Sequence, residues 1–172
     1  MKKMFMIALM SLAMTSQVSA QDVLNDIVNR AHALFNDSSK NKQDRQVALF
    51  KYDALTYLRT KVIQPTDVMG NSVDYDKLNA KIKMLNEQAF AMNTYVNVYF
   101  ERLAQCKKKN VDMVKFYFRQ ATKDHPLFQE ETDLEYVDAY FNQEKEFPLP
   151  FSMNCDWVKT LEFIRTIDWS DK

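Results

Sequence analysis

Cys106 and Cys155 carry the most definite chemistry in this chain of 172 residues. In an oxidising compartment, which the first twenty residues indicate, two cysteines usually pair. A disulfide closing a loop of this length would stabilise the fold by about 4 kcal/mol on the chain-entropy model. A reactive thiol fits less well, because Cys106 lies on an apolar stripe where burial disfavours the thiolate. We therefore predict a Cys106–Cys155 disulfide, with two unpaired buried thiols as the alternative.

The histidines offer little for metal binding or proton transfer, because His32 and His125 are the only two in the chain. A zinc site or an HExxH motif needs histidines at fixed spacing. His125 follows an expected helix end, where an imidazolium interacts favourably with the helix dipole. His32 borders an apolar stripe, a position typical of packed or surface histidines. Structural roles therefore fit both residues better than acid–base catalysis, and we expect neither a metal nor another cofactor.

Acidic residues gather between positions 130 and 146, and carboxylate oxygens are the ligands that calcium prefers. The members of the group are Glu130, Glu131, Asp133, Glu135, Asp138, Glu144 and Glu146. The sequence lacks the alternating ligands and central glycine of a calcium loop, so a solvated helix surface explains the group better. Calcium binding is an alternative. A hydrolase working through two carboxylates is another, although no spacing singles out a pair.

The chain contains a single glycine, Gly70. Phosphate-binding loops, dinucleotide-binding fingerprints and nucleophile elbows each need several glycines at close backbone approaches. The sequence therefore argues against those enzyme classes. It also disfavours all-β folds, whose many tight turns consume glycine.

The first twenty residues have the three parts of a secretory signal peptide. Lys2 and Lys3 supply the positive start, positions 4–14 an apolar run too short to span a bilayer, and positions 18–20 a cleavage site of small residues. We expect the mature protein to begin at Gln21 and to be periplasmic or extracellular. A lipid anchor would need a cysteine where Gln21 stands, so we expect a free protein.

Residues 21–172 have the length of one domain, and no apolar run among them approaches the roughly 20 residues that span a membrane. We therefore expect a single domain and no membrane insertion after cleavage. The chain balances 23 basic against 23 acidic residues. This balance argues against nucleic acid as a partner, since nucleic-acid binding depends on clustered Lys and Arg.

Apolar residues recur at helical spacing along most of the chain. The predicted helices cover 22–35, 42–63, 75–106, the stretch from Asn110 to before Pro126, a short stretch after Thr132 and a last stretch after Asn154. In 75–106 the apolar positions, from Tyr75 onward, advance by alternating steps of three and four, as in a helix packed within a bundle. Capping patterns mark four starts, at Asn41 with Asp44, at Asn110, at Thr132 with Glu135 and at Asn154.

These elements predict an all-α, single-domain bundle of five to six helices around one long central helix. The alternative is a short α–α superhelix of tetratricopeptide-like hairpins. Phe118, Ala121 and Pro126 have the spacing of the second helix of such a repeat. The corresponding first-helix positions are polar, however, which favours the bundle.

An apolar stretch without helical spacing, 147–151, precedes the last predicted helix. Phe147, Pro148 and Phe151, together with Trp157, are our candidates for a ligand-binding or partner-binding surface. The competing interpretation is a lid packed over the bundle. We expect a non-catalytic module that binds another protein or a component of the cell envelope. A carrier of a small apolar ligand in an aromatic pocket between helices is the alternative.

Overall fold

The computed structural model describes residues 22–69 and 73–169, and within them it is all-helical with no strand. The helices are α1 (Asp22–Asn36), α2 (Lys42–Val62), α3 (Pro65–Val68), α4 (Tyr75–Gln105), α5 (Val111–Asp124), α6 (Leu134–Val137) and α7 (Trp157–Thr166), with 3-10 turns at Lys108–Asn110 and Phe141–Gln143. The predicted all-α fold class is therefore confirmed. The predicted signal peptide and Gly70 lie outside the described residues. No helix in the described part of the chain is long and apolar enough to cross a membrane.

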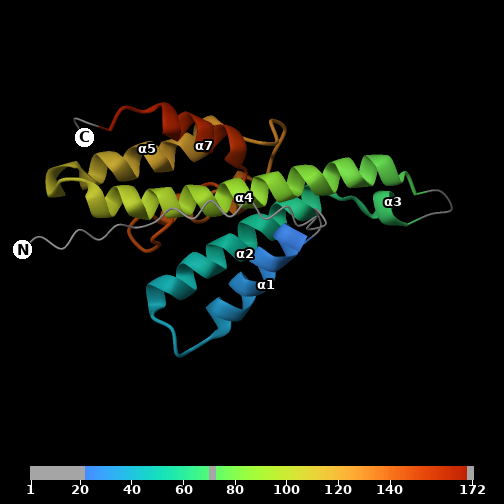
Figure 1. Ribbon diagram of the computed structural model, residues 1–172, viewed down its shortest axis with the longest axis horizontal. Helices are drawn as coiled ribbons and strands as arrows, with labels where there is room; N and C mark the ends of the chain where they lie inside the picture. Colours follow the sequence, from blue (N-terminus) through green and yellow to red (C-terminus); the bar gives the residue numbers. More distant parts are fainter. Residues whose placement is uncertain (1–21, 70–72, 170–172) are drawn as a thin grey trace, which may run out of the picture.

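The long helix α4 is the axis of the bundle, with α1 and α2 on one side and α5 and α7 on the other (Figure 1). Its middle is buried on two faces. The predicted stripe supplies Leu85, Ala89, Met92, Val96 and Tyr99, with Asn86 at its edge, and a second stripe supplies Gln88, Ala91 and Tyr95. Tyr75 departs from the prediction, because it was expected to face inward and is 70% exposed.

Aromatic rings fill the centre of the bundle. The six most deeply buried aromatics, each at most 2% exposed, are Phe50, Tyr95, Tyr99, Phe118, Phe151 and Trp157. Tyr95 contacts Phe151 and Trp157 edge-on, with ring centroids 5.5 and 5.6 Å away, and its hydroxyl donates a 2.6 Å hydrogen bond to the backbone oxygen of Phe118. Edge-to-face packing stabilises such pairs beyond the burial of their area, and the hydrogen bond satisfies the buried hydroxyl.

A buried amide on α4 fixes where α7 begins. Gln88 donates from Nε2 to Oδ1 of Asp156 (3.0 Å) and accepts at Oε1 from the backbone N–H of Trp157 (2.7 Å). Asp156 is the N-cap of α7, and its own carboxylate accepts from the backbone of Lys159. The first turn of α7 therefore has its free N–H groups satisfied partly from another helix.

A second buried amide, two residues earlier on α4, does the same for α1. Asn86 accepts a 2.8 Å hydrogen bond at Oδ1 from the backbone N–H of Leu24, and it donates from Nδ2 to the oxygen of Ile82. Both ends of the Asn86 amide are thus occupied.

The structure confirms one predicted cap and corrects three. Asn41 accepts from the backbone of Asp44 and donates to its carboxylate, both at 2.8 Å, as the capping pattern predicts. Asn110 occupies the N-cap position of α5 but makes no capping bond with its side chain, because a 3-10 turn leads into the helix.

The other two corrected caps are one and two residues further along than predicted. Asp133, not Thr132, caps α6 by accepting from the backbone of Tyr136 at 3.1 Å. Asp156, not Asn154, caps α7. The Asn154 amide instead bonds both backbone groups of Phe128, at 2.8 and 2.9 Å, and so ties the connecting segment to itself.

The predicted disulfide is wrong, because Cys106 and Cys155 are both free thiols. Gln88 places the start of α7 beside the middle of α4, whereas Cys106 follows the end of α4, about 27 Å further along at 1.5 Å per residue. A disulfide needs its two Cα atoms within about 7 Å. The Cys155 sulfur lies 3.1 Å from Oγ1 of Thr160, and the Cys106 sulfur donates to the backbone oxygen of Leu103.

We expect unequal reactivity of the two thiols. Burial raises the pKa of Cys155, so in the folded protein its thiol resists alkylation while the partly exposed Cys106 reacts. Mass spectrometry after iodoacetamide treatment without reductant should show one adduct in buffer and two in denaturant. A denatured protein that takes up no label until it is reduced would contradict the free-thiol structure.

Replacing Gln88 with leucine should destabilise the fold by about 2–3 kcal/mol, because the buried N–H of Trp157 and a carboxylate oxygen of Asp156 lose their partner. Urea unfolding followed by circular dichroism measures the change. Gln105→Leu, at an exposed position of the same helix, is the matched control and should have little effect. Equal midpoints for the two variants would show that the amide does not hold α7.

Candidate functional site

The predicted aromatic surface divides between the core and a groove. Phe151 and Trp157 are 0% exposed and belong to the aromatic core, where no partner reaches them in the folded state. Phe147 and Pro148 are partly exposed and line an open groove of about 350 Å³ together with Tyr99 and Phe100. The Phe147 ring also packs edge-on against Tyr140, 4.9 Å between centroids. Most apolar side chains of the segment 147–151 are therefore packed against the bundle, and only Phe147 and Pro148 remain partly accessible.

Several of the acidic residues after position 130 bond to other groups within the fold. Glu131 accepts from Lys61 (2.7 Å) and from the Tyr57 hydroxyl (2.6 Å), and its side chain is 3% exposed. Asp133 caps α6, and Asp138 forms an ion pair with Lys123. These contacts hold the segment after α5 against α2 and α5. In the residues that the structure describes, no group of three His, Cys, Asp or Glu side chains could hold a metal ion.

A second tyrosine–carboxylate pair lies one turn away on α2. The Tyr140 hydroxyl donates a 2.6 Å hydrogen bond to Oδ2 of Asp53. Burial raises the pKa of Asp53, while the bond from Tyr140 opposes that rise. Because Tyr140 is itself buried, this pair acts as a further tie between α2 and the segment after α5.

Both histidines pack against aromatic rings. The His32 ring lies 5.2 Å from Phe35 and 5.3 Å from Tyr52, and the His125 ring lies 5.3 Å from Phe163. His32 thus packs beside the apolar stripe, as the sequence predicts, and His125 stands at the C-cap of α5, the helix end at which the sequence places it.

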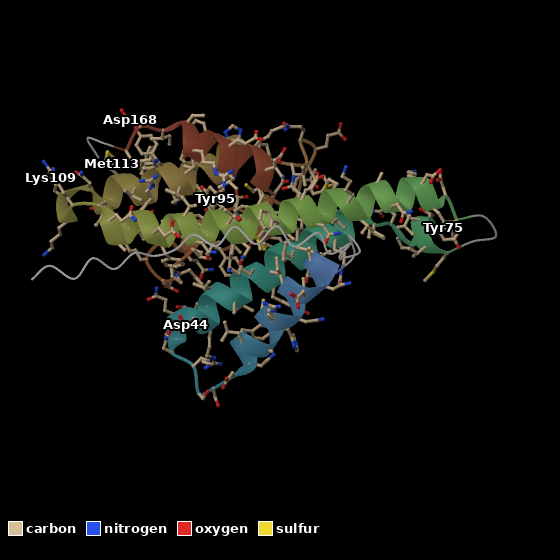
Figure 2. All side chains as sticks on the ribbon, in the orientation of Figure 1. Asp44, Tyr75, Tyr95, Lys109, Met113 and Asp168 are labelled. Atoms are coloured by element: carbon tan, nitrogen blue, oxygen red, sulfur yellow. The ribbon has the colours of Figure 1, made fainter. Side chains whose placement is uncertain are left out.

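Three exposed apolar side chains lie where α4 extends beyond the rest of the bundle. Met69 is 74% exposed, Tyr75 70% and Val68 48%, and the first two are the most exposed large apolar residues in the described chain. Figure 1 shows α3 beside this end of α4, and Figure 2 places Tyr75 there. We call Val68, Met69 and Tyr75 the apolar tip.

The helix α3 is fixed in this place by a compact set of polar contacts. Pro65 occupies its first turn, where the missing N–H costs nothing, and Asp67 accepts from the backbone of Gln64 at 2.7 Å. Lys81 of α4 bonds the same carboxylate at 2.5 Å. The bond from Lys81 is the main cause of the lowered pKa of Asp67, so this carboxylate stays ionised and α3 stays on α4.

Beside the apolar tip lies a recess of about 260 Å³. Its apolar walls are Leu24, Ile63, Val68, Leu78, Ile82 and Leu85, and its polar lining is Asn25, Arg59 and Asn86. The Asn86 amide is already occupied, as described above. Arg59 makes no ion pair with any carboxylate of the described residues, so its charge is available at the recess.

The sequence analysis missed this surface because it placed the apolar positions from Tyr75 onward on one inward stripe and predicted no helix between residues 63 and 75. Leu78 does line the recess, but Tyr75 projects into solvent. Two apolar residues, Val68 and Met69, inside an otherwise polar loop were the available signal.

The Glu131 contacts should make stability depend on acid. Hydrogen bonds from Lys61, Tyr57 and the backbone of Asp133 lower the pKa of Glu131 from 4.5 to about 2. Because this pKa is lowered, the ionised carboxylate stabilises the fold above about pH 4.5, and the stabilisation is lost as the pH falls toward 2.

Glu131→Gln should therefore cost about 1 kcal/mol at pH 7, a modest value because Lys61 is half exposed and solvent screens the pair. The cost should shrink at pH 3, and urea midpoints at the two pH values measure it. Glu130→Gln, at the exposed neighbouring position, should show no such pH dependence. A cost that is the same at both pH values would contradict the role of the carboxylate.

Comparisons with protein-family models, with curated proteins and with solved structures find no match to this chain. Its function is therefore inferred from its own residues.

Proposed function

We propose that this chain is a non-catalytic binding protein that engages another protein through the apolar tip and the adjoining recess. The observation that carries the proposal is the position of the two most exposed large apolar side chains of the described residues, Met69 and Tyr75. They lie beside an apolar recess lined by Arg59, which forms no ion pair with any described residue. Exposed apolar patches rimmed by polar groups are typical of interaction sites.

The size and charge of the recess indicate what kind of segment fits it. A volume of about 260 Å³ is below the roughly 300–1,000 Å³ of pockets that enclose drug-sized ligands, and it suits one large side chain of a partner. A carboxylate next to that side chain would pair with the Arg59 guanidinium, whose fork matches a carboxylate in shape. The partner segment is therefore expected to present a large apolar residue beside an Asp or Glu.

The carrier alternative has less support. The aromatic rings that would line its pocket pack against one another in the core, at centroid distances of 5.1–6.5 Å, instead of around a cavity. We place the binding activity in the periplasm or outside the cell, on the basis of the expected signal peptide at positions 1–20, and a partner in the cell envelope is consistent with that place.

The proposal is tested by photo-crosslinking in the producing cell, with benzoylphenylalanine at position 75 in place of tyrosine. One discrete heavier species is expected, and mass spectrometry of the crosslinked peptide should identify an apolar residue next to Asp or Glu. Arg59→Glu should lower the yield about tenfold, because a charge-assisted contact becomes a repulsion.

The matched control places the same crosslinker at Phe116, which is 57% exposed on α5. Equal adducts from positions 75 and 116, or a yield insensitive to Arg59→Glu, would overturn the proposal. A species of twice the mass of the chain would show self-association in place of a different partner.

A further inference from the structure

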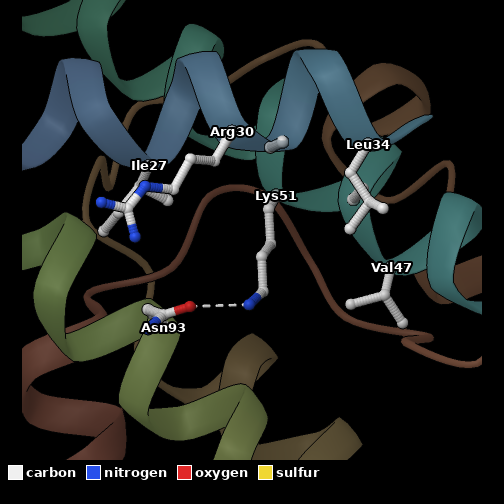
Figure 3. Close-up of a pocket in the computed structure, with 8 residues that line it drawn as sticks. Ile27, Arg30, Leu34, Val47, Lys51 and Asn93 are labelled. Carbon is white, nitrogen blue, oxygen red and sulfur yellow. Dashed lines mark hydrogen bonds between the residues drawn. The ribbon is translucent and has the colours of Figure 1, made fainter. Parts of the chain in front are cut away.

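A second pocket, of about 230 Å³, lies between α1, α2 and α4 (Figure 3). Its walls are aliphatic and come from Ile27, Ala31, Leu34, Val47 and Ala48. Three polar side chains complete it, namely Arg30, Lys51 and Asn93. It shares no lining residue with the recess beside the apolar tip.

Lys51 crosses this pocket from α2 toward α4, and its amine donates a 2.6 Å hydrogen bond to Oδ1 of Asn93 (Figure 3). An ammonium has three donors, so the asparagine occupies one of them. No carboxylate of the described residues forms an ion pair with Lys51. Burial lowers its pKa, which reflects how poorly the surroundings compensate the charge.

The second cation of the pocket is already neutralised. Arg30 pairs with Asp26 at 2.6 Å on the surface of α1, and its side chain is 78% exposed. Lys51 is therefore the one cation of this pocket that lacks an anionic partner within the described residues. A partly buried charge without a counter-ion is unfavourable, and an anion that enters the pocket would remove that cost.

We propose that this pocket binds a small aliphatic monocarboxylate, whose carboxylate pairs with Lys51 and whose alkyl chain contacts the aliphatic walls. A single unneutralised cation matches one negative charge, whereas a phosphate dianion calls for more donors than the pocket provides. The volume suits a chain of about four to eight carbons, because a drug-sized molecule needs a larger pocket. This ligand site is independent of the proposed partner surface.

The test is calorimetric titration of the full chain with sodium hexanoate at pH 7, with 1-hexanol and sodium phosphate as probes of tail and charge alone. Hexanoate should bind with a Kd below about 1 mM, and both other probes at least about tenfold more weakly. Lys51→Met should weaken hexanoate binding at least about tenfold. Lys42→Met, at an exposed lysine of the same helix, should leave binding unchanged.

Folding of the variants is checked by thermal melting. In the absence of ligand, Lys51→Met should melt at least as high as the natural chain, because it removes a partly buried charge. If Lys51→Met melts at a lower temperature than the natural chain, the Lys51–Asn93 hydrogen bond stabilises the fold, and this result would count against a ligand-binding role for Lys51. Val47→Phe, which narrows the pocket without changing its charge, supplies a second variant and should also abolish hexanoate binding.

Three results would overturn the inference. Hexanoate and hexanol binding equally would exclude a role for Lys51, and phosphate binding as tightly as hexanoate would reduce the pocket to an unselective anion site. The absence of both heat of binding in calorimetry and chemical-shift changes in an NMR titration, up to about 10 mM hexanoate, would exclude the site altogether.

Discussion

Two buried amides on α4, Asn86 and Gln88, set the positions of the helices on either side. Residues two apart on a helix point in nearly opposite directions, so one amide reaches the start of α1 and the other the start of α7. Apolar packing alone tolerates sliding, because one aliphatic contact resembles the next. A buried amide that bonds particular backbone groups prevents sliding, because a shift of the helix would leave those groups without a hydrogen-bond partner.

Both proposed binding surfaces follow from this register. Because α1 and α7 begin beside residues 86 and 88, the first turns of α4 extend beyond them. Of the described helices, only α3 and the end of α2 lie against these turns, which leaves the apolar tip and its recess open. Asn93 lies two turns after Asn86 on the same face of α4, toward α1 and α2. It therefore meets Lys51 in the gap between these helices.

The periodicity of apolar residues predicted most of the helices. It could not predict the contacts that depend on how the helices are placed against one another. The pattern over 75–106 closely matches α4, because its apolar positions repeat without interruption. The failed disulfide has a different cause, since the spacing of Cys106 and Cys155 in sequence says nothing about where α7 begins along α4. The two misplaced caps arose where a second capable residue stood one or two positions away. Nothing in the sequence distinguishes Lys51 from a solvent-exposed lysine, because its partner Asn93 lies on another helix, α4.

The segment between α5 and α7 contains little regular structure, yet it covers the core as a packed helix would. It contributes Leu149, Phe151 and Met153 to the core, each at most 1% exposed. Its backbone lacks the repeated bonds of a helix, so side chains must anchor it: Tyr140 on Asp53, Glu131 on Lys61 and Tyr57, Asn154 on Phe128. With no disulfide to close this loop, these polar contacts and the burial of its apolar side chains keep the segment over the aromatic core. Glu131 and Asp138, two of the acidic residues that suggested calcium or catalysis in the sequence, thus help to hold the segment over the core.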